Sequence, residues 1–241
     1  MPSKINCLFS HKCNERAHSI GKQLHISLAN FAINLQIDPF DAGDDVYVRM
    51  QTFDIEAVLL LLEPLSLSSK PVQLELESAS RQGLPIFVAH VEGEVPETFK
   101  TRSFWHVPPL DSQHFSPEAA MLAEPIRRRV LFNRKIRSLN PDEYFHAMSE
   151  VAKEIAMEEN RTIIAEFACE LARRYCRVSD PTTRYWLAIA LGRADTPEAM
   201  RLLDALPNPS HPLETEGIRE AREIVNHEKR LSQTSYSSIL K

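Results

Sequence analysis

The first half of the chain contains several apolar runs of strand length. Ile5–Phe9 is a short apolar run, and the alternation of apolar and polar residues over Ile33–Ile37 predicts a half-buried strand. Ala57–Leu62 holds six apolar residues in a row, a pattern typical of a central parallel strand that is covered on both faces. Leu84–Val91 predicts a fourth strand, and Ser103–Val107 predicts a fifth at the edge of the sheet.

Helical spacing fills the stretches between these runs. Four apolar residues on one helix face follow the first strand, namely Ala17, Ile20, Leu24 and Leu28. We expect a short helix from Val46 to about Asp54, and another that begins at Pro71 and ends at Gly83. Because strands and helices alternate with short connections, the first half predicts an α/β fold with a parallel sheet.

The second half of the chain has a different pattern. After Val107–Pro117 the strand signals cease, and apolar residues continue at helical spacing. Thr182–Leu206 resembles one unit of a HEAT-type helical repeat, in which two antiparallel helices are joined by a short turn. We therefore expect two domains: an α/β domain over residues 1–112 and an all-α, HEAT-repeat-like domain over residues 113–241.

Composition and charge narrow the classes of function. The 241 residues allow two modest domains, and 43% hydrophobic with 25% charged residues is the ordinary globular range. The net charge of −5 does not favour nucleic-acid binding. No apolar run suits a membrane span or a signal peptide. Four cysteines without a Cys-x-x-Cys pair fit reduced thiols, so we expect a cytoplasmic protein that contacts no membrane.

Neither metal ligands nor a nucleic-acid motif emerge from the charged and sulfur-bearing residues. Cys7, His11 and Cys13 do not have the spacing of a zinc site, and the acidic loop Asp38–Asp45 lacks the spacing of an EF-hand. We therefore expect no metal site. Ile126–Arg137 holds six cationic side chains and no acid. We interpret it as a solvated helix face or a partner of the acidic first half, with a phosphate backbone or an acidic partner surface as the alternative.

Three loops are expected to meet at one edge of the predicted sheet. They are Phe9–His11 after the first strand, the loop that begins at Asp38, and Ser66–Lys70 after the third strand. In open α/β sheets, ligands bind beyond the carboxyl ends of the strands. The loops therefore predict a ligand crevice at this edge.

The order of motifs resembles a Toll/interleukin receptor (TIR) domain over roughly residues 4–107. The matching pieces are FSHK (Phe9–Lys12), DPFDAGDDV (Asp38–Val46), AVLLLLEPLSLSS (Ala57–Ser69) and VQLELESA (Val72–Ala79). The resemblance implies a flavodoxin-like five-stranded parallel sheet. It also implies an enzyme that hydrolyses or cyclises NAD at the nicotinamide–ribose bond, with Glu75 as the catalytic residue. NAD is then a substrate, and no cofactor is expected.

Two positions depart from the family pattern. The family commonly carries a tryptophan four residues before the glutamate, where this chain has Pro71. After the first strand the chain has Cys13 and Asn14 where an aspartate is frequent, which affects the expected cap of the following helix. In this family, activity usually follows self-association through the loop that corresponds to Asp38–Val46. The resemblance thus implies an oligomer, with a role in signal transduction or bacterial antiviral defence.

The chemistry of NAD cleavage explains why one carboxylate is sufficient. Nicotinamide leaves as a neutral group while positive charge develops on the ribose, so a fixed carboxylate beside the sugar stabilises the transition state. The other substrate contacts are assigned to the loops after the first two strands: Phe9, Ser10, His11, Asp38 and Phe40. Ser10 and His11 are expected to contact phosphate or ribose, and Phe9 or Phe40 to stack on an aromatic ring.

Three other interpretations stay open on the sequence alone. Glu75 is, by default, a solvated residue of a surface helix, and the domain is then a non-enzymatic adaptor that only assembles with similar domains. A nucleoside deoxyribosyltransferase-like enzyme shares the sheet type and a catalytic glutamate, but its further acidic and aromatic partners are not found in the sequence. For the helical half, we expect a role in binding a protein partner.

Overall fold

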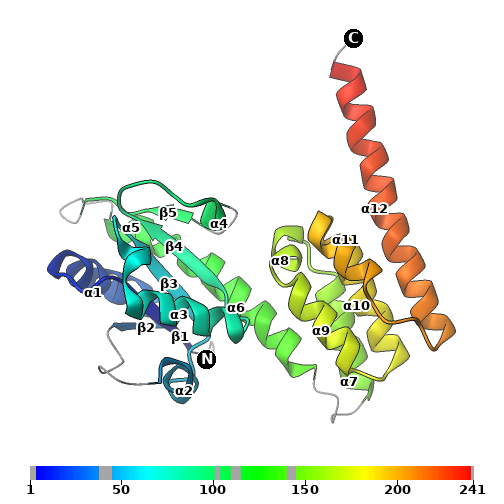
Figure 1. Cartoon of the computed structure of the whole chain (residues 1–241), viewed down its shortest axis with the longest axis horizontal. Helices are drawn as coiled ribbons and strands as arrows, with labels where there is room; N and C mark the ends of the chain where they lie inside the picture. The colour runs from blue at the N-terminus through cyan, green and yellow to red at the C-terminus, as the bar shows by residue number, and fades with distance from the viewer. Residues whose placement is uncertain (1–3, 38–44, 101–103, 110–114, 140–144, 240–241) are drawn as a thin grey trace. The chain divides into compact units, whose positions relative to one another are not determined.

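A computed structural model of the chain describes residues 4–37, 45–100, 104–109, 115–139 and 145–239. It has a five-stranded α/β region followed by a region made only of helices, as predicted (Figure 1). The chain divides into two compact units, residues 1–131 and residues 132–241. Within the described residues, no helix combines the length and the apolar character needed to cross a membrane.

The five predicted strands are all present and all parallel. Their bounds are β1 (Ile5–Ser10), β2 (Ile33–Ile37), β3 (Ala57–Leu62), β4 (Ile86–His90) and β5 (Phe104–His106). They pair in the order β2-β1-β3-β4-β5, which is the order of flavodoxin-like doubly wound sheets. Because every strand runs the same way, the residues that follow β1, β3 and β4 all emerge at the carboxyl edge of the sheet.

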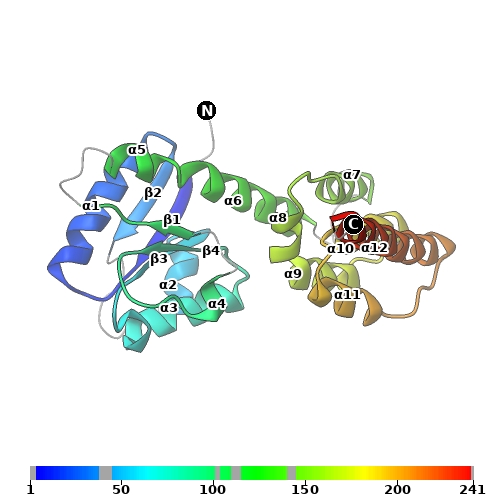
Figure 2. The same cartoon turned by 90° about the horizontal axis from the view of Figure 1, so that it is seen from above.

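Helices cover both faces of this sheet, as Figure 2 shows. One face carries α1 (Glu15–Ala29), α5 (Phe115–Ala120) and the first half of α6 (Ala123–Ser138). The other carries α2 (Val46–Thr52), α3 (Lys70–Arg81) and α4 (Glu97–Lys100), and a 3₁₀ turn (Ser66–Ser68) precedes α3. Alternate residues of β1, β3 and β4 enter the two cores, and each fully buried leucine contributes about 1.5–3 kcal/mol through removal from water.

Local sequence explains how α1 lies so close to β1. The side chain of Asn14 caps the helix by accepting a hydrogen bond from the Ala17 N–H at 2.7 Å. Gly21 lies directly over β1, since a Cβ at this position would be 2.8 Å from the ring of Phe9. The missing side chain of Gly21 therefore makes room for the Phe9 ring.

The first unit extends further than the sequence predicted. The boundary was expected between residues 112 and 113, but the two units divide between Leu131 and Phe132, inside α6. Phe115, Ile126 and Val130 are buried in the core on the α1 face of the sheet. A doubly wound sheet needs helices on both faces, so the helices after β5 belong to the α/β unit although they follow the last strand signal.

The second unit is a set of helices around α10. Its elements are α7 (Phe145–Ala156), α8 (Arg161–Glu166), α9 (Ala168–Arg177), α10 (Pro181–Arg193), α11 (Pro197–Asp204) and α12 (Pro212–Ile239). The side chains of Asp180 and Thr196 cap α10 and α11, the helices that follow them. Residues 187–192 of α10 are all buried, which is the pattern of a helix surrounded by others.

One charged group is buried where α10 meets α12. The carboxylate of Glu214 is 1% exposed and lies 3.3 Å from the Arg184 guanidinium. It also accepts a hydrogen bond from the Ser210 N–H at 2.9 Å. The same guanidinium lies over the ring of Tyr175, 5.5 Å from its centroid. Burial, and then the nearby Glu214 carboxylate, raises the pKa of the Tyr175 hydroxyl.

Candidate functional site

Ser10 ends the central strand β1 at the carboxyl edge of the sheet. Its neighbour Leu8 enters the core beneath α2 and α3, so strand alternation places Ser10 on the face of α3. Ser10 is fully buried, and its Oγ has no hydrogen-bond partner among the described residues. A buried hydroxyl without a partner is costly in a folded protein, and such groups often serve a ligand.

His11 and Phe9 flank Ser10 in the sequence but lie in different environments. The Nδ1 of His11 is 3.0 Å from the backbone carbonyl of Lys12, and the residue is 8% exposed. Its ring is tilted against that of Phe9, with centroids 5.0 Å apart. Phe9 itself is 1% exposed and belongs to the core beneath α1, on the opposite face of the sheet from α3. Its ring therefore packs α1 onto the sheet.

Glu75 lies in the second turn of α3, at the border of the buried stripe of this helix. The stripe consists of Val72, Ser78 and Ala79, and Glu75 itself is partly buried. It shares its flank with the buried Ser78, one turn further on. The opposite flank faces solvent and includes Glu77, whose carboxylate pairs with Arg81. The two glutamates of this helix thus have different surroundings, although they are two residues apart.

The start of α3 follows from its sequence. Pro71 occupies the first turn, where a residue without an N–H is tolerated, and the preceding Ser69 has extended backbone angles. Pro71 therefore acts as a helix start. Since α3 begins at the carboxyl edge of β3, its first two turns, with Glu75 in the second, lie nearest to the end of the sheet where Ser10 is found.

The loop between β2 and α2 contributes one described residue. Asp38 and Phe40, the two candidates assigned to this loop, lie outside the described residues. Asp45 caps α2, because its carboxylate accepts hydrogen bonds from the N–H groups of Tyr47 at 3.0 Å and Val48 at 3.2 Å. The last acid of this loop therefore has a structural role.

A second carboxylate at this edge was not singled out from the sequence. Glu63 directly follows β3 and is 8% exposed. Its carboxylate accepts a hydrogen bond from the Asn14 side chain at 2.9 Å, and its N–H donates to Ser66 Oγ at 2.9 Å. Glu63 also lines a pocket of about 300 Å³ between the loop after β3 and the loop after β4, Glu92–Pro96. The sequence signal that could have identified Glu63 is its position directly after the six apolar residues Ala57–Leu62.

Exposed apolar side chains follow the loop of residues 38–45. Tyr47 and Val48, in the first turn of α2, are 38% and 51% exposed. Leu74 on the neighbouring helix α3 is 41% exposed. Single exposed apolar side chains are common on proteins, and only a contiguous patch of them marks a binding surface. We refer to Tyr47, Val48 and Leu74 together as the α2–α3 apolar surface.

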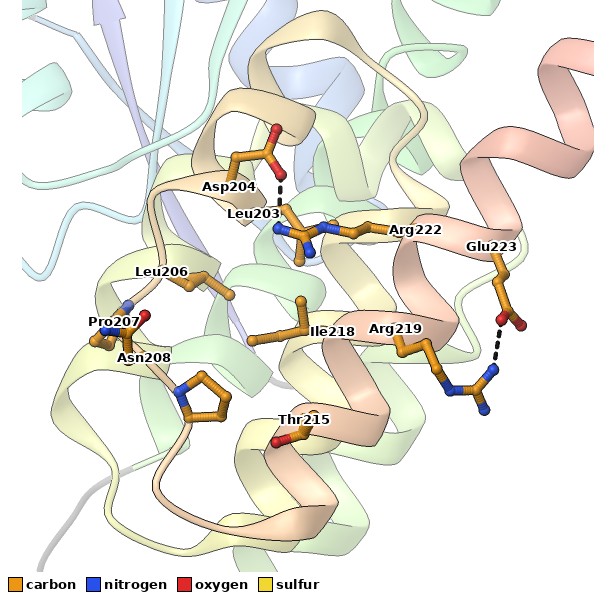
Figure 3. A pocket seen from close by; sticks show the side chains of 11 residues that line it. Leu203, Asp204, Leu206, Pro207, Asn208, Thr215, Ile218, Arg219, Arg222 and Glu223 are labelled. Atoms are coloured by element: carbon orange, nitrogen blue, oxygen red, sulfur yellow. Dashed lines mark hydrogen bonds and ion pairs between the residues drawn. The ribbon is translucent and has the colours of Figure 1, made fainter.

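A larger pocket, of about 480 Å³, lies in the helical unit between α11, residues 206–209 and α12. Figure 3 shows Leu206 and Ile218 pointing toward one another across its floor. The charged side chains at its rim are already paired: Arg222 with Asp204 at 2.9 Å, and Arg219 with Glu216 and Glu223. The pocket thus combines an apolar floor with a rim of internal ion pairs.

The basic stretch of residues 126–137 makes contacts within each unit. Arg127 donates a hydrogen bond to the Phe31 carbonyl at 2.9 Å, and the Arg129 guanidinium lies 5.6 Å from the centroid of the Phe87 ring. In the second unit, Lys135 pairs with Glu154 at 2.9 Å. Arg127, Arg129 and Lys135 therefore contact groups of the protein itself.

No protein-family model, curated protein or solved structure matches the chain.

Proposed function

We propose that the first unit is a TIR-type NAD⁺ nucleosidase, in which Glu75 is the catalytic carboxylate. The observation that carries the proposal is the position of Glu75 at the border of the buried stripe of α3. That helix packs on the same face of the sheet as the buried Ser10 hydroxyl. A carboxylate and an unsatisfied hydroxyl on one face, near the carboxyl edge, suit a polar ligand that carries a sugar.

The proposed chemistry needs few groups from the protein. Glu75 stabilises positive charge on the ribose as the bond to nicotinamide breaks, and it orients the ribose hydroxyls. Ser10 and His11 bind the adjacent ribose or phosphate. The pyridine nitrogen loses its positive charge as the bond breaks, so no general acid is required for departure. Attack by water gives the linear product, and attack by a group of the same substrate gives the cyclic one.

Assembly is the second part of the proposal. In the sequence, Tyr47 and Val48 directly follow the loop Asp38–Val46, to which the TIR resemblance assigns self-association. We therefore propose that copies of the first unit associate through the α2–α3 apolar surface. The HEAT-like helical unit then binds a protein partner and acts as the sensor. The same surface also supports the alternative of a non-enzymatic adaptor, which assembles in the same way but does not cleave NAD⁺. Activity, and not assembly, separates these two functions.

The test is nicotinamide release from NAD⁺ by the full-length protein, measured by chromatography at high protein concentration with a crowding agent. We expect Glu75→Gln to lower the rate about 100-fold or more, because the variant removes the charge that stabilises the ribose cation. Glu77→Gln is the matched control, since it changes the same group on the solvent flank of the same helix, and its rate is expected to equal that of the wild type.

Two outcomes would contradict the assignment. Equal rates in the wild type and Glu75→Gln would exclude Glu75 as the catalytic residue. Absence of nicotinamide release by an assembled wild-type protein would support the adaptor. Size-exclusion chromatography with light scattering shows whether the protein has assembled, and Val48→Asp, on the α2–α3 apolar surface, serves as the variant that should prevent assembly.

A further inference from the structure

Two histidines lie side by side where β4 and β5 end. The parallel register pairs His90 with His106, so the two side chains project from the same face of the sheet. Their Nδ1 atoms are 3.3 Å apart. We propose that His90 and His106 form a binding site for a divalent transition-metal ion such as Zn²⁺, with both Nδ1 atoms as ligands. The site is independent of the proposed NAD⁺ cleavage.

The distances between the two rings match coordination of one ion. Two imidazole nitrogens bound at about 2.05 Å to a tetrahedral ion lie about 3.3 Å apart. Their ring centres, each about 1.1 Å behind the nitrogen, are then about 5.2 Å apart. The observed separations are 3.3 Å between the Nδ1 atoms and 5.2 Å between the ring centroids of His90 and His106. A straight N–H···N hydrogen bond at the same nitrogen distance would put the ring centres about 5.5 Å apart.

The surroundings of His90 fix the tautomer that a metal requires. Its Nε2 lies 2.9 Å from the backbone carbonyl oxygen of Gly93. A carbonyl oxygen only accepts hydrogen bonds, so the proton of the neutral ring is on Nε2 and the lone pair is on Nδ1. This arrangement, with one ring nitrogen donating to a carbonyl and the other left to the ion, is the usual outer shell of a metal-binding histidine. Gly93 makes the tight turn with a φ of 95°.

The two proposed ligands differ in exposure to solvent. His90 is 9% exposed and is therefore held in place by its neighbours, whereas His106 is exposed. In the described part of the chain, no group of three His, Cys, Asp or Glu side chains is arranged to hold a metal. The remaining positions of the ion are therefore taken by water or by an added ligand, as in metal sites that stay open.

Ligand chemistry selects the class of ion. Neutral imidazole nitrogens suit Zn²⁺, Cu²⁺, Ni²⁺ and Co²⁺, whereas Ca²⁺ and Mg²⁺ require oxygen ligands. A bound ion would link the three-residue edge strand β5 to β4, and through the Gly93 hydrogen bond it would also hold the loop after β4. That loop forms one wall of the pocket that Glu63 lines. The site would thus stabilise one side of the carboxyl edge.

Isothermal titration of the chelator-treated full-length protein with Zn²⁺ tests the site. We expect one site per chain, and at least tenfold weaker binding in His106→Ala and in His90→Ala. His106→Ala is the more informative variant, because its side chain is exposed and the core is unaffected by truncation. His18→Ala, which removes an exposed histidine of α1, is the control and should bind Zn²⁺ as the wild type does.

Two further readouts distinguish this site from the exposed thiols of Cys13, Cys169 and Cys176. The Co²⁺-loaded protein should show the visible absorption of nitrogen and oxygen coordination, without the near-ultraviolet bands of thiolate ligands. Zn²⁺ should raise the melting temperature of the wild type and of His18→Ala but not that of His106→Ala. Unchanged Zn²⁺ affinity in both histidine variants, absence of Zn²⁺ binding by the wild type, or thiolate bands would each overturn the proposal.

Discussion

The carboxyl edge of the sheet and the α10–α12 junction each bury a glutamate, but the two carboxylates have different partners. At the junction, Glu214 is paired with the cation of Arg184 and with the Ser210 N–H. At the sheet edge, Glu63 accepts from the neutral Asn14, and the nearby Ser10 Oγ has no partner among the described residues. The junction satisfies its charge internally, whereas the edge keeps polar groups that a ligand can use.

The largest expected effect on stability is at the junction. Glu214→Ala leaves the partly buried Arg184 guanidinium without its carboxylate, so we expect the free energy of unfolding to fall by about 3 kcal/mol. Urea unfolding followed by the fluorescence of Trp186 on α10, in a Trp105→Phe background, reports on this unit. Asp204→Ala removes a carboxylate from an exposed ion pair with Arg222 and should cost about 1 kcal/mol or less. Equal losses in the two variants would show that Glu214 is not specially important.

At the sheet edge, substitution of Asn14 should have an intermediate effect on stability, because its side chain both caps α1 and donates a hydrogen bond to Glu63. Asn14→Ala removes the α1 cap and the hydrogen bond to Glu63, and we expect a loss of about 1–3 kcal/mol. Asn14→Ser keeps the cap but not the reach to Glu63, so it should recover part of the loss. Urea unfolding followed by Trp105 fluorescence, in a Trp186→Phe background, measures both. If serine restores the full stability, the hydrogen bond to Glu63 contributes nothing.

A smaller effect concerns Tyr185, at the rim of the junction. Its hydroxyl donates a hydrogen bond to Glu220 at 2.7 Å, and this bond, with burial second, raises the pKa of Tyr185 to about 12. Because the folded pKa exceeds the unfolded value, the stabilisation is complete below about pH 10 and is lost as the pH rises through about 12. Alkaline absorbance titration should show a late-ionising tyrosine, in addition to Tyr175, that is missing in Tyr185→Phe. Unchanged titration curves would contradict the hydrogen bond.

The smallest effect on stability is expected at Ser10. Ser10→Ala removes a buried hydroxyl that lacks a partner among the described residues, so stability should change by less than about 1 kcal/mol or rise slightly. Binding of NAD⁺ should nevertheless weaken, because the hydroxyl is assigned to the substrate. Thermal unfolding with and without NAD⁺ measures both quantities. A large loss of stability without NAD⁺ would mean that Ser10 has a structural partner.

Local pattern was sufficient to predict the sheet, because each strand shows its burial in its own residues. Ala57–Leu62 is buried on both faces, and its six apolar residues indicate this directly. The domain boundary was missed because Phe115, Ile126 and Val130 have ordinary helical spacing, which does not reveal that they pack on a sheet. The helical spacing of apolar residues indicates that one face of a helix is buried, but it does not identify the element that packs on that face.

The position of a site residue could be predicted only where it follows from the pattern of a single segment. The position of Ser10 at the end of β1 follows from the strand pattern. The approach of His90 to His106 depends on the register of β4 and β5, and that register is set by the whole sheet. The hydrogen bond from Asn14 to Glu63 likewise joins residues that are 49 positions apart. Contacts between residues so far apart in the chain cannot be recognised from one local stretch of sequence.

The role of Glu75 can be tested by a crystal structure of the full-length Glu75→Gln variant with NAD⁺ bound. We expect the side chain at position 75 to lie within hydrogen-bond distance of the nicotinamide ribose, and the Ser10 hydroxyl to contact the same ligand. NAD⁺ bound away from α3, for example in the pocket lined by Glu63 or in the pocket between α11 and α12, would contradict it.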